Sequence, residues 1–222
     1  MQQWMTLTTP LGPVRTWQAA PTAPARGGVV LLQEIFGVTA HIRRVADGYA
    51  AAGYAVLAPA LFDPVQPGAE LPCDAAGMTQ GRHLAALLGF DGAVRIVQAA
   101  SHWLREAGHR VAAIGYCWGG SVAYLANTRL RLPAVSYYGA RTVPFLPEPL
   151  QAPMLFHFGQ DDALIPPEDI QRHRLAHPDA TVHVYPGGHA FNRDDDPVHF
   201  HEASAELARQ RTLSFLAEHL HD

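Results

Sequence analysis

Apolar runs of strand length alternate with helical periodicities along most of the chain. Two short strands are expected on either side of a turn at residues 11–13. Further strands are expected at residues 28–33, 54–58, 110–116, 134–138, 154–158 and 181–185, and helices at 40–52, 82–107, 120–127, 167–174 and 199–219. Strands that are apolar throughout, separated by helices, are typical of a mostly parallel central sheet with helices on both faces. The fold class predicted is therefore α/β.

Two glycines and one long segment rich in Pro and Gly interrupt this alternation. Residues 60–81 are rich in Pro and Gly without any period, so we expect a long surface loop there. The helix that follows is expected to break near Gly89 and Gly92.

Length and composition favour one soluble globular domain. The 222 residues are 48% hydrophobic and 16% charged, which indicates a single domain over residues 1–222 and argues against disorder. All 16 basic residues are Arg, so mechanisms that need a lysine Schiff base or a P-loop lysine are excluded. The formal net charge of −4 with no basic stripe argues against nucleic acid as a partner.

The N-terminus and the cysteines predict a cytoplasmic protein. No basic start followed by an apolar stretch is present, and the apolar runs are shorter than the roughly 20 residues of a membrane span. Cys73 and Cys117 are too few for a disulfide framework or a Cys-rich zinc site. We therefore expect neither a membrane nor a metal.

The most informative motif is Gly-x-Cys-x-Gly at residues 115–119, between a predicted strand and a predicted helix. In such a strand-to-helix turn the middle side chain, Cys117, is exposed at the carboxyl edge of the sheet. The helix N-terminus favours the thiolate form, which is the nucleophile. The simpler interpretation is a small buried cysteine in a Gly-rich turn. The flanking strand, the helix and the additional Gly120 favour a nucleophile.

A base and an orienting acid follow the next strand ends in the order that such a nucleophile requires. Asp161 and Asp162 come directly after the predicted strand 154–158, and His189 follows the strand 181–185 within Gly-Gly-His. Only one of two neighbouring carboxylates in a turn can face the histidine. The residues alone leave Asp161 and Asp162 open.

These residues resemble the dienelactone hydrolase family of α/β-hydrolases over roughly residues 28–216. The shared motifs are Gln-Glu-Ile-Phe-Gly at 33–37, Gly-Tyr-Cys-Trp-Gly-Gly at 115–120, Tyr-Tyr-Gly at 137–139, the segment 159–166 and Gly-His-Ala-Phe at 188–191. The resemblance implies the α/β-hydrolase fold and a triad of Cys117, His189 and Asp162. It prefers Asp162 because family members place the acid three residues after Gly159 and four before Pro166.

The resemblance also implies roles for residues around the triad. By this resemblance, Glu34 would accept the thiol proton until a substrate carboxylate displaces it; the alternative is a buried glutamate satisfied by backbone N–H groups or by an arginine. Two arginines pair with that carboxylate, for which Arg193 and Arg82 are the matching positions. The oxyanion would lie between the backbone N–H groups of Trp118 and Ile35. Phe36 and Tyr137 complete the expected substrate contacts, although core packing is the alternative for Tyr137, and surface charge is the alternative for each arginine.

The sequence departs from the family pattern at Ala86, Gly89 and Ala190, where larger or polar residues are usual. These differences concern the choice of lactone more than the chemistry.

The function expected is a cysteine-dependent hydrolase that opens a lactone or cleaves a small carboxylic ester through a thioester acyl-enzyme. Its substrate would be a small molecule that bears a carboxylate, and no cofactor is expected. The alternatives are a general carboxylesterase or thioesterase, and a non-catalytic redox-sensing or ligand-binding relative. We expect a monomer or weak homodimer. The pairs His173/His177 and His199/His201 have ligand-like spacing but weak specificity in a chain with 13 histidines.

Overall fold

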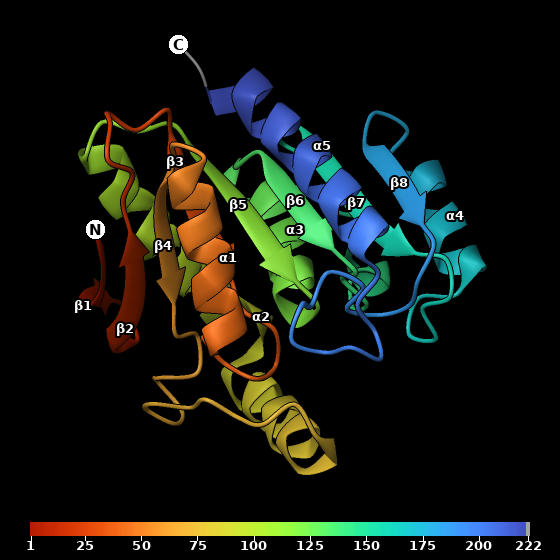
Figure 1. Ribbon diagram of the computed structural model, residues 1–222, viewed down its shortest axis with the longest axis horizontal. Helices are drawn as coiled ribbons and strands as arrows, with labels where there is room; N and C mark the ends of the chain where they lie inside the picture. Colours follow the sequence, from red (N-terminus) through yellow and green to blue (C-terminus); the bar gives the residue numbers. More distant parts are fainter. Residues whose placement is uncertain (221–222) are drawn as a thin grey trace. The chain divides into compact units, whose positions relative to one another are not determined.

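A computed structural model describes residues 1–220 of the chain (Figure 1). These residues form two compact units: residues 1–112 together with residue 220, and residues 113–219. Each unit has its own strands, helices and buried apolar side chains. The single domain expected from the sequence stays a prediction.

The first unit contains four strands in the order β1-β2-β4-β3. β1 (Gln2–Thr9) and β2 (Gly12–Ala19) form an antiparallel hairpin, and β2 pairs antiparallel with β4 (Ala55–Pro59). β3 (Gly28–Leu32) runs parallel to β4. The sheet is therefore mixed at its N-terminal hairpin, where both strands are longer than the sequence pattern predicts.

Two helices cover this unit. In Figure 1, α1 (Ala40–Ala51) crosses in front of the strands, and the C-terminal half of α2 (Ala75–Glu106) lies behind them. α2 is long and apolar enough to span a membrane by these two criteria alone. Its side chains nevertheless pack against β1, β3 and β4, as those of a core helix do.

The beginning of α2 corrects the predicted loop at residues 60–81. The side chain of Asp74 accepts a hydrogen bond of 2.8 Å from the backbone N–H of Gly77, so the helix begins at Ala75. Asp is a favoured N-cap residue because its carboxylate satisfies an otherwise free helical N–H. The predicted break is found at Gly89, whose φ is +68°, whereas Gly92 is helical.

The second unit contains four strands in the order β5-β6-β7-β8, and all their pairings are parallel. They are β5 (Val111–Tyr116), β6 (Ala134–Tyr137), β7 (Met154–Gly159) and β8 (Thr181–Tyr185). Every residue of β5, β6 and β7 is buried, which explains their continuous apolar sequence. β8 is partly exposed.

Helices cover both faces of this second sheet. α3 (Trp118–Leu130) packs on the face of Phe156, whose ring lies 6.0 Å from that of Tyr124 in the helix. α5 (Glu202–Leu220) packs on the opposite face, where Tyr137 and His157 contact its Thr212. Successive strand side chains point to opposite faces, so this division follows from the two-residue period of a strand. The predicted parallel sheet with helices on both faces is confirmed here.

The remaining elements agree closely with expectation. α4 (Pro167–Ala176) lies between β7 and β8 in the chain, and a short 3-10 helix, Val143–Phe145, was not predicted. α3 begins at Trp118, two residues before the expected start, and α5 begins at Glu202 rather than residue 199. Because the four strands are parallel, the segments that follow β5, β6, β7 and β8 meet at one edge of the sheet.

Candidate active site

Cys117 occupies the sharp turn between β5 and α3. Its φ of 53° and ψ of −117° are strained for a residue with a side chain. The backbone N–H of Cys117 donates to the carbonyl of Tyr137 at 3.0 Å, which ties the turn to the end of β6. Cys117 is also the N-cap residue of α3, so its Sγ lies at the positive end of the helix dipole.

Glycines make this turn possible because the backbone approaches itself closely. A Cβ at Gly115 would lie 1.9 Å from the carbonyl oxygen of Gly119. A Cβ at Gly120 would lie 2.7 Å from the carbonyl oxygen of Tyr137. No side chain fits at either distance, and the sequence motif is explained by these two contacts.

The structure brings Cys117, His189 and Asp162 together in one hydrogen-bonded chain. His189 Nε2 lies 3.0 Å from Cys117 Sγ, and His189 Nδ1 lies 2.8 Å from Asp162 Oδ2. The Asp162 side chain is fully buried, and that of His189 is 20% exposed. These are the distances expected of a nucleophile, its base and the acid that orients the base.

The charges and hydrogen bonds around His189 favour a charged imidazole. Burial lowers the pKa of His189, but the charge on Cys117 and hydrogen bonds with Asp162 and Cys117 outweigh the burial and raise that pKa to about 10. An imidazolium held between a sulfur anion and a carboxylate is stabilised on both sides. The arrangement therefore holds a proton on the imidazole, next to Cys117 Sγ.

The structure also separates Asp162 from its neighbour. Asp162 Oδ1 accepts a hydrogen bond of 2.8 Å from the backbone N–H of Leu164, so both of its carboxylate oxygens are engaged. Asp161 is exposed, and its backbone N–H donates to the carbonyl of Gly187 at 3.0 Å. Asp162 is thus the partner of His189, as the resemblance implies.

The sequence analysis did not assign a role to Tyr138, which lies against the histidine, or to Asn192, which Tyr138 contacts. The Tyr138 ring makes an edge contact with the His189 ring at a centroid distance of 4.9 Å, and the Tyr138 hydroxyl donates to Asn192 Oδ1. The sequence signal for Tyr138 was the Tyr-Tyr-Gly motif at 137–139. The predicted strand 134–138 included Tyr138, whereas β6 ends at Tyr137, so Tyr138 lies just past the strand.

Tyr137, by contrast, lies in the core. Its side chain is 1% exposed, and its hydroxyl is 2.7 Å from Thr212 Oγ1 on α5. The packing alternative for Tyr137 therefore fits the structure, because the last residue of β6 points to the face of the sheet rather than to its edge.

Arg193 lies on the same turn as His189. It is 7% exposed, and its Nη1 is 3.4 Å from Asp196 Oδ2. Its backbone N–H donates to the carbonyl of Ala190 at 2.9 Å. The role expected for Arg193 toward a substrate carboxylate stays a prediction.

Four expected site residues lie in the first unit. Glu34 and Phe36 follow β3 and are buried, with exposures of 2% and 5%. Ile35 lies between them, and its carbonyl oxygen would be 2.1 Å from a Cβ at Gly81 of α2. Arg82, the next residue of α2, is exposed. The roles expected for these four residues stay predictions.

The histidine pairs with ligand-like spacing have structural partners. His173 Nε2 is 2.6 Å from the Thr142 hydroxyl, and its Nδ1 is 2.6 Å from the carbonyl of Asp169. His177 Nε2 is 2.8 Å from the Tyr124 hydroxyl. Both ring nitrogens of His173 are therefore occupied by hydrogen bonds.

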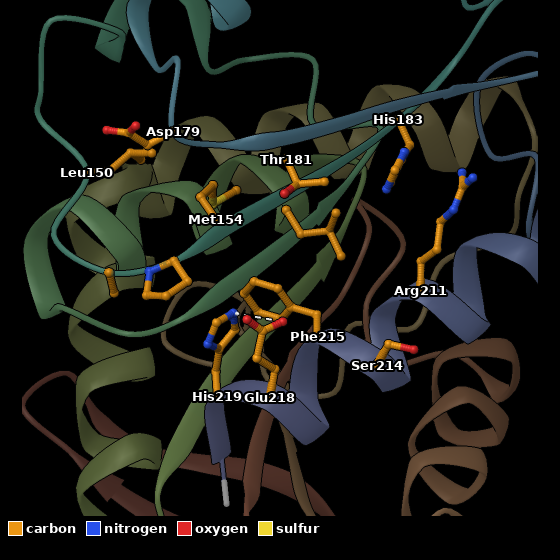
Figure 2. A pocket seen from close by; sticks show the side chains of 13 residues that line it. Leu150, Met154, Asp179, Thr181, His183, Arg211, Ser214, Phe215, Glu218 and His219 are labelled. Atoms are coloured by element: carbon orange, nitrogen blue, oxygen red, sulfur yellow. Dashed lines mark ion pairs between the residues drawn. The ribbon is translucent and has the colours of Figure 1, made fainter.

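A separate groove of about 720 Å³ lies at the other edge of the second sheet (Figure 2). It is lined by Met154 and Thr181, the first residues of β7 and β8, and by side chains of α5. Figure 2 shows Arg211 and His183 toward one end and Asp179 toward the other. The triad follows the last residues of the strands, so this groove is not the reaction site.

Comparison with known proteins identifies the family. The dienelactone hydrolase family matches residues 14–220. The chain is 31% identical to carboxymethylenebutenolidase 1 of Cupriavidus pinatubonensis over 209 residues, which covers 89% of this chain and 88% of the relative. It is 32% identical to the carboxymethylenebutenolidase of Pseudomonas putida over 217 residues, which covers 91% of each.

Comparison with solved structures points to the same family. A Klebsiella pneumoniae structure assigned to the dienelactone hydrolases matches with a TM-score of 0.86 at 26% identity and covers 98% of each chain. The α/β-hydrolase fold is thereby confirmed, and the chain is a hydrolase that acts on ester bonds. By its sequence and its fold, the chain belongs to the dienelactone hydrolase family.

Proposed function

We propose that this protein opens a lactone or cleaves a small carboxylic ester with Cys117 as the nucleophile. The observation that carries the proposal is the continuous chain from Asp162 through His189 to Cys117, with contacts of 2.8 and 3.0 Å. A thiolate in this arrangement attacks a carbonyl carbon, and the imidazolium beside it supplies a proton.

The reaction proceeds in two steps. In the first, Cys117 Sγ forms a bond to the carbonyl carbon, the ester C–O bond breaks, and the departing oxygen takes the proton of the His189 imidazolium, which leaves the imidazole neutral. In the second, His189 removes a proton from water, the resulting hydroxide attacks the thioester carbon, and the C–S bond breaks. Asp162 stabilises the charged imidazole in both steps. The backbone N–H group of Trp118, the residue after the nucleophile, is a proposed donor to the oxyanion.

The nucleophile is tested with a panel of lactones and activated esters. We expect Cys117→Ala to abolish hydrolysis, since no other group in the triad can form the acyl intermediate. Cys73→Ala is the matched control because it removes the other, exposed cysteine. Intact-mass spectrometry of the wild type mixed with a slow ester should show one added acyl group, which Cys117→Ala should not acquire. Hydrolysis by Cys117→Ala at the wild-type rate would contradict the proposal.

We further propose that the substrate bears a carboxylate that pairs with Arg193. Arg193→Ala should raise the KM of a carboxylate-bearing ester by about tenfold, because an ion-paired hydrogen bond is lost. The KM of a neutral ester of equal size should change little. Asp196→Asn tests for indirect effects, since it removes the ion-pair partner of Arg193 but keeps the arginine.

If Arg193→Ala changes the KM of the carboxylate-bearing ester and that of the neutral ester by the same factor, the general carboxylesterase or thioesterase is favoured. A wild-type protein that hydrolyses no ester or lactone, while Cys117 still alkylates readily, would favour a non-catalytic relative.

A further inference from the structure

Tyr138 has a backbone conformation that is unusual for a bulky residue. Its φ is +40°, in the left-handed region, and it directly follows the last residue of β6. Its backbone N–H donates to the carbonyl of His157 at 2.8 Å, and its side chain is fully buried. A strained residue of this kind persists only where the surrounding structure holds it, and such residues gather at functional sites.

The conformation places Tyr138 differently from its neighbour. Tyr137 lies on the sheet face, where it contacts Thr212. Tyr138 instead reaches the edge of the sheet, where its ring lies 4.9 Å from that of His189 at an interplanar angle of 61°. Tyr137 therefore packs in the core, whereas the adjacent Tyr138 contacts the catalytic histidine proposed above.

The hydroxyl of Tyr138 reaches the turn that carries the histidine. It donates a hydrogen bond to Oδ1 of Asn192, three residues after His189. The Tyr138 side chain thus contacts the imidazole with its ring and the turn with its hydroxyl.

This turn has little regular structure of its own. It follows β8, and both Gly187 and Ala190 have positive φ, of 109° and 63°. Phe191 anchors it by packing 5.6 Å from Tyr138 and 5.3 Å from Tyr185, measured between ring centroids. The distance from His189 to Cys117 depends on where this turn is held.

We propose that Tyr138 and Asn192 are positioning residues for His189. Their hydrogen bond ties the histidine-bearing turn to the carboxyl end of β6, the same strand end that accepts the backbone hydrogen bond of Cys117. The positions of the imidazole and of the thiol are thereby both fixed by the carboxyl end of β6. This inference rests on the proposed function, because it assigns a supporting role around the same triad.

The test uses Tyr138→Phe, Asn192→Ala and the double variant. Tyr138→Phe keeps the ring against His189 and removes only the hydroxyl. We expect each single variant to lower kcat roughly tenfold with little change in KM, since the base is misplaced while substrate contacts remain. The double variant should be no slower than either single variant, because both changes break the same bond.

The second readout is the pKa of His189, followed by NMR of its ring. The groups that face His189 are Cys117, Asp162 and Tyr138. Looser contacts with Cys117 and Asp162 should lower the pKa of His189 in both single variants. The rate of Cys117 alkylation by iodoacetamide at a fixed neutral pH should fall with it. Neither measurement needs a substrate, so they test the positioning role even if the proposed reaction is wrong.

Tyr137→Phe is the matched control. It removes a buried tyrosine hydroxyl from the preceding residue, and that hydroxyl bonds to Thr212 rather than to the turn. We expect the pKa of His189 to keep its wild-type value in this variant. An unchanged His189 pKa in Tyr138→Phe and Asn192→Ala, equal effects in Tyr137→Phe, or additive losses of kcat in the double variant would each overturn the proposal.

Discussion

Asp161 and Asp162 are chemically identical neighbours with different surroundings. Asp162 is 4% exposed and accepts hydrogen bonds from His189 and from the backbone of Leu164. Asp161 is exposed to water on the same turn. The difference arises because adjacent side chains in a turn point in different directions, so only one of the two carboxylates can act on the imidazole.

Asparagine substitutions separate these two residues. Asp162→Asn should lower kcat/KM by about 10²- to 10⁴-fold, because an amide does not stabilise the imidazolium and favours the wrong tautomer. Asp161→Asn should stay near the wild-type value. Steady-state kinetics on one activated ester measures both variants, and circular dichroism checks that they fold. Equal losses in the two variants would show that the assignment of the acid is wrong.

At the scale of elements, the turn from β5 through Cys117 to α3 determines where the nucleophile lies. The strain at Cys117 is accommodated because Gly115 and Gly120 let the backbone pass at contact distance. Elsewhere, a glycine can lower the stability of a helix without serving a close backbone contact. Gly48 lies within α1, and a Cβ there would meet nothing within 4 Å.

Substitution by alanine should therefore have opposite effects on stability at Gly115 and at Gly48. Gly115→Ala forces a Cβ to within 1.9 Å of a backbone oxygen, so we expect loss of activity and a lower melting temperature. Gly48→Ala should raise the free energy of unfolding by about 0.5–1 kcal/mol, because alanine loses less conformational freedom in a helix. Thermal and urea denaturation measure both. A Gly115→Ala protein with wild-type stability and activity would contradict the close approach.

The predicted elements were reliable where their signals are local. The parallel strands and the break at Gly89 follow from apolar runs and a glycine. The start of α2 was missed because Asp74 acts as a cap through one side-chain hydrogen bond within a segment whose composition favours a loop. The sequence analysis named Cys117 and His189 because each follows a predicted strand, whereas Asn192 follows no such rule.

At the scale of the whole molecule, several histidines are held neutral in the interior. Burial places the pKa of His157 well below its ordinary value of 6.5. Burial also lowers the pKa of His173 and of His177. Below pH 6.5 the unfolded chain binds more protons at these positions than the folded protein does. Acid therefore favours unfolding.

We expect the free energy of unfolding to fall as the pH is lowered from 7 to 5. His157 alone contributes at most about 1.4 kcal/mol per pH unit, the value for one proton. His157→Gln should make the dependence shallower, and the exposed His83→Gln should leave it unchanged. Urea denaturation at pH 7, 6 and 5 measures the slopes.

The raised pKa of His189 acts in the opposite direction to the buried histidines, and mainly above pH 6.5. Because its folded value is raised to about 10, its contribution is complete below pH 6.5 and declines only above it. Parallel slopes for the wild type and His157→Gln would contradict the role assigned to His157.

The sequence by itself determined the α/β class, and it named Cys117 and His189, which the structure places 3.0 Å apart. These depend on local patterns, since apolar periodicity, glycine spacing and the position after a strand are all written in neighbouring residues. Only the tertiary structure decided that Asp162 rather than Asp161 faces the imidazole, that Tyr137 packs in the core, and that Tyr138 reaches Asn192. Those choices depend on side-chain direction and on contacts between segments far apart in the chain, which a linear pattern does not specify.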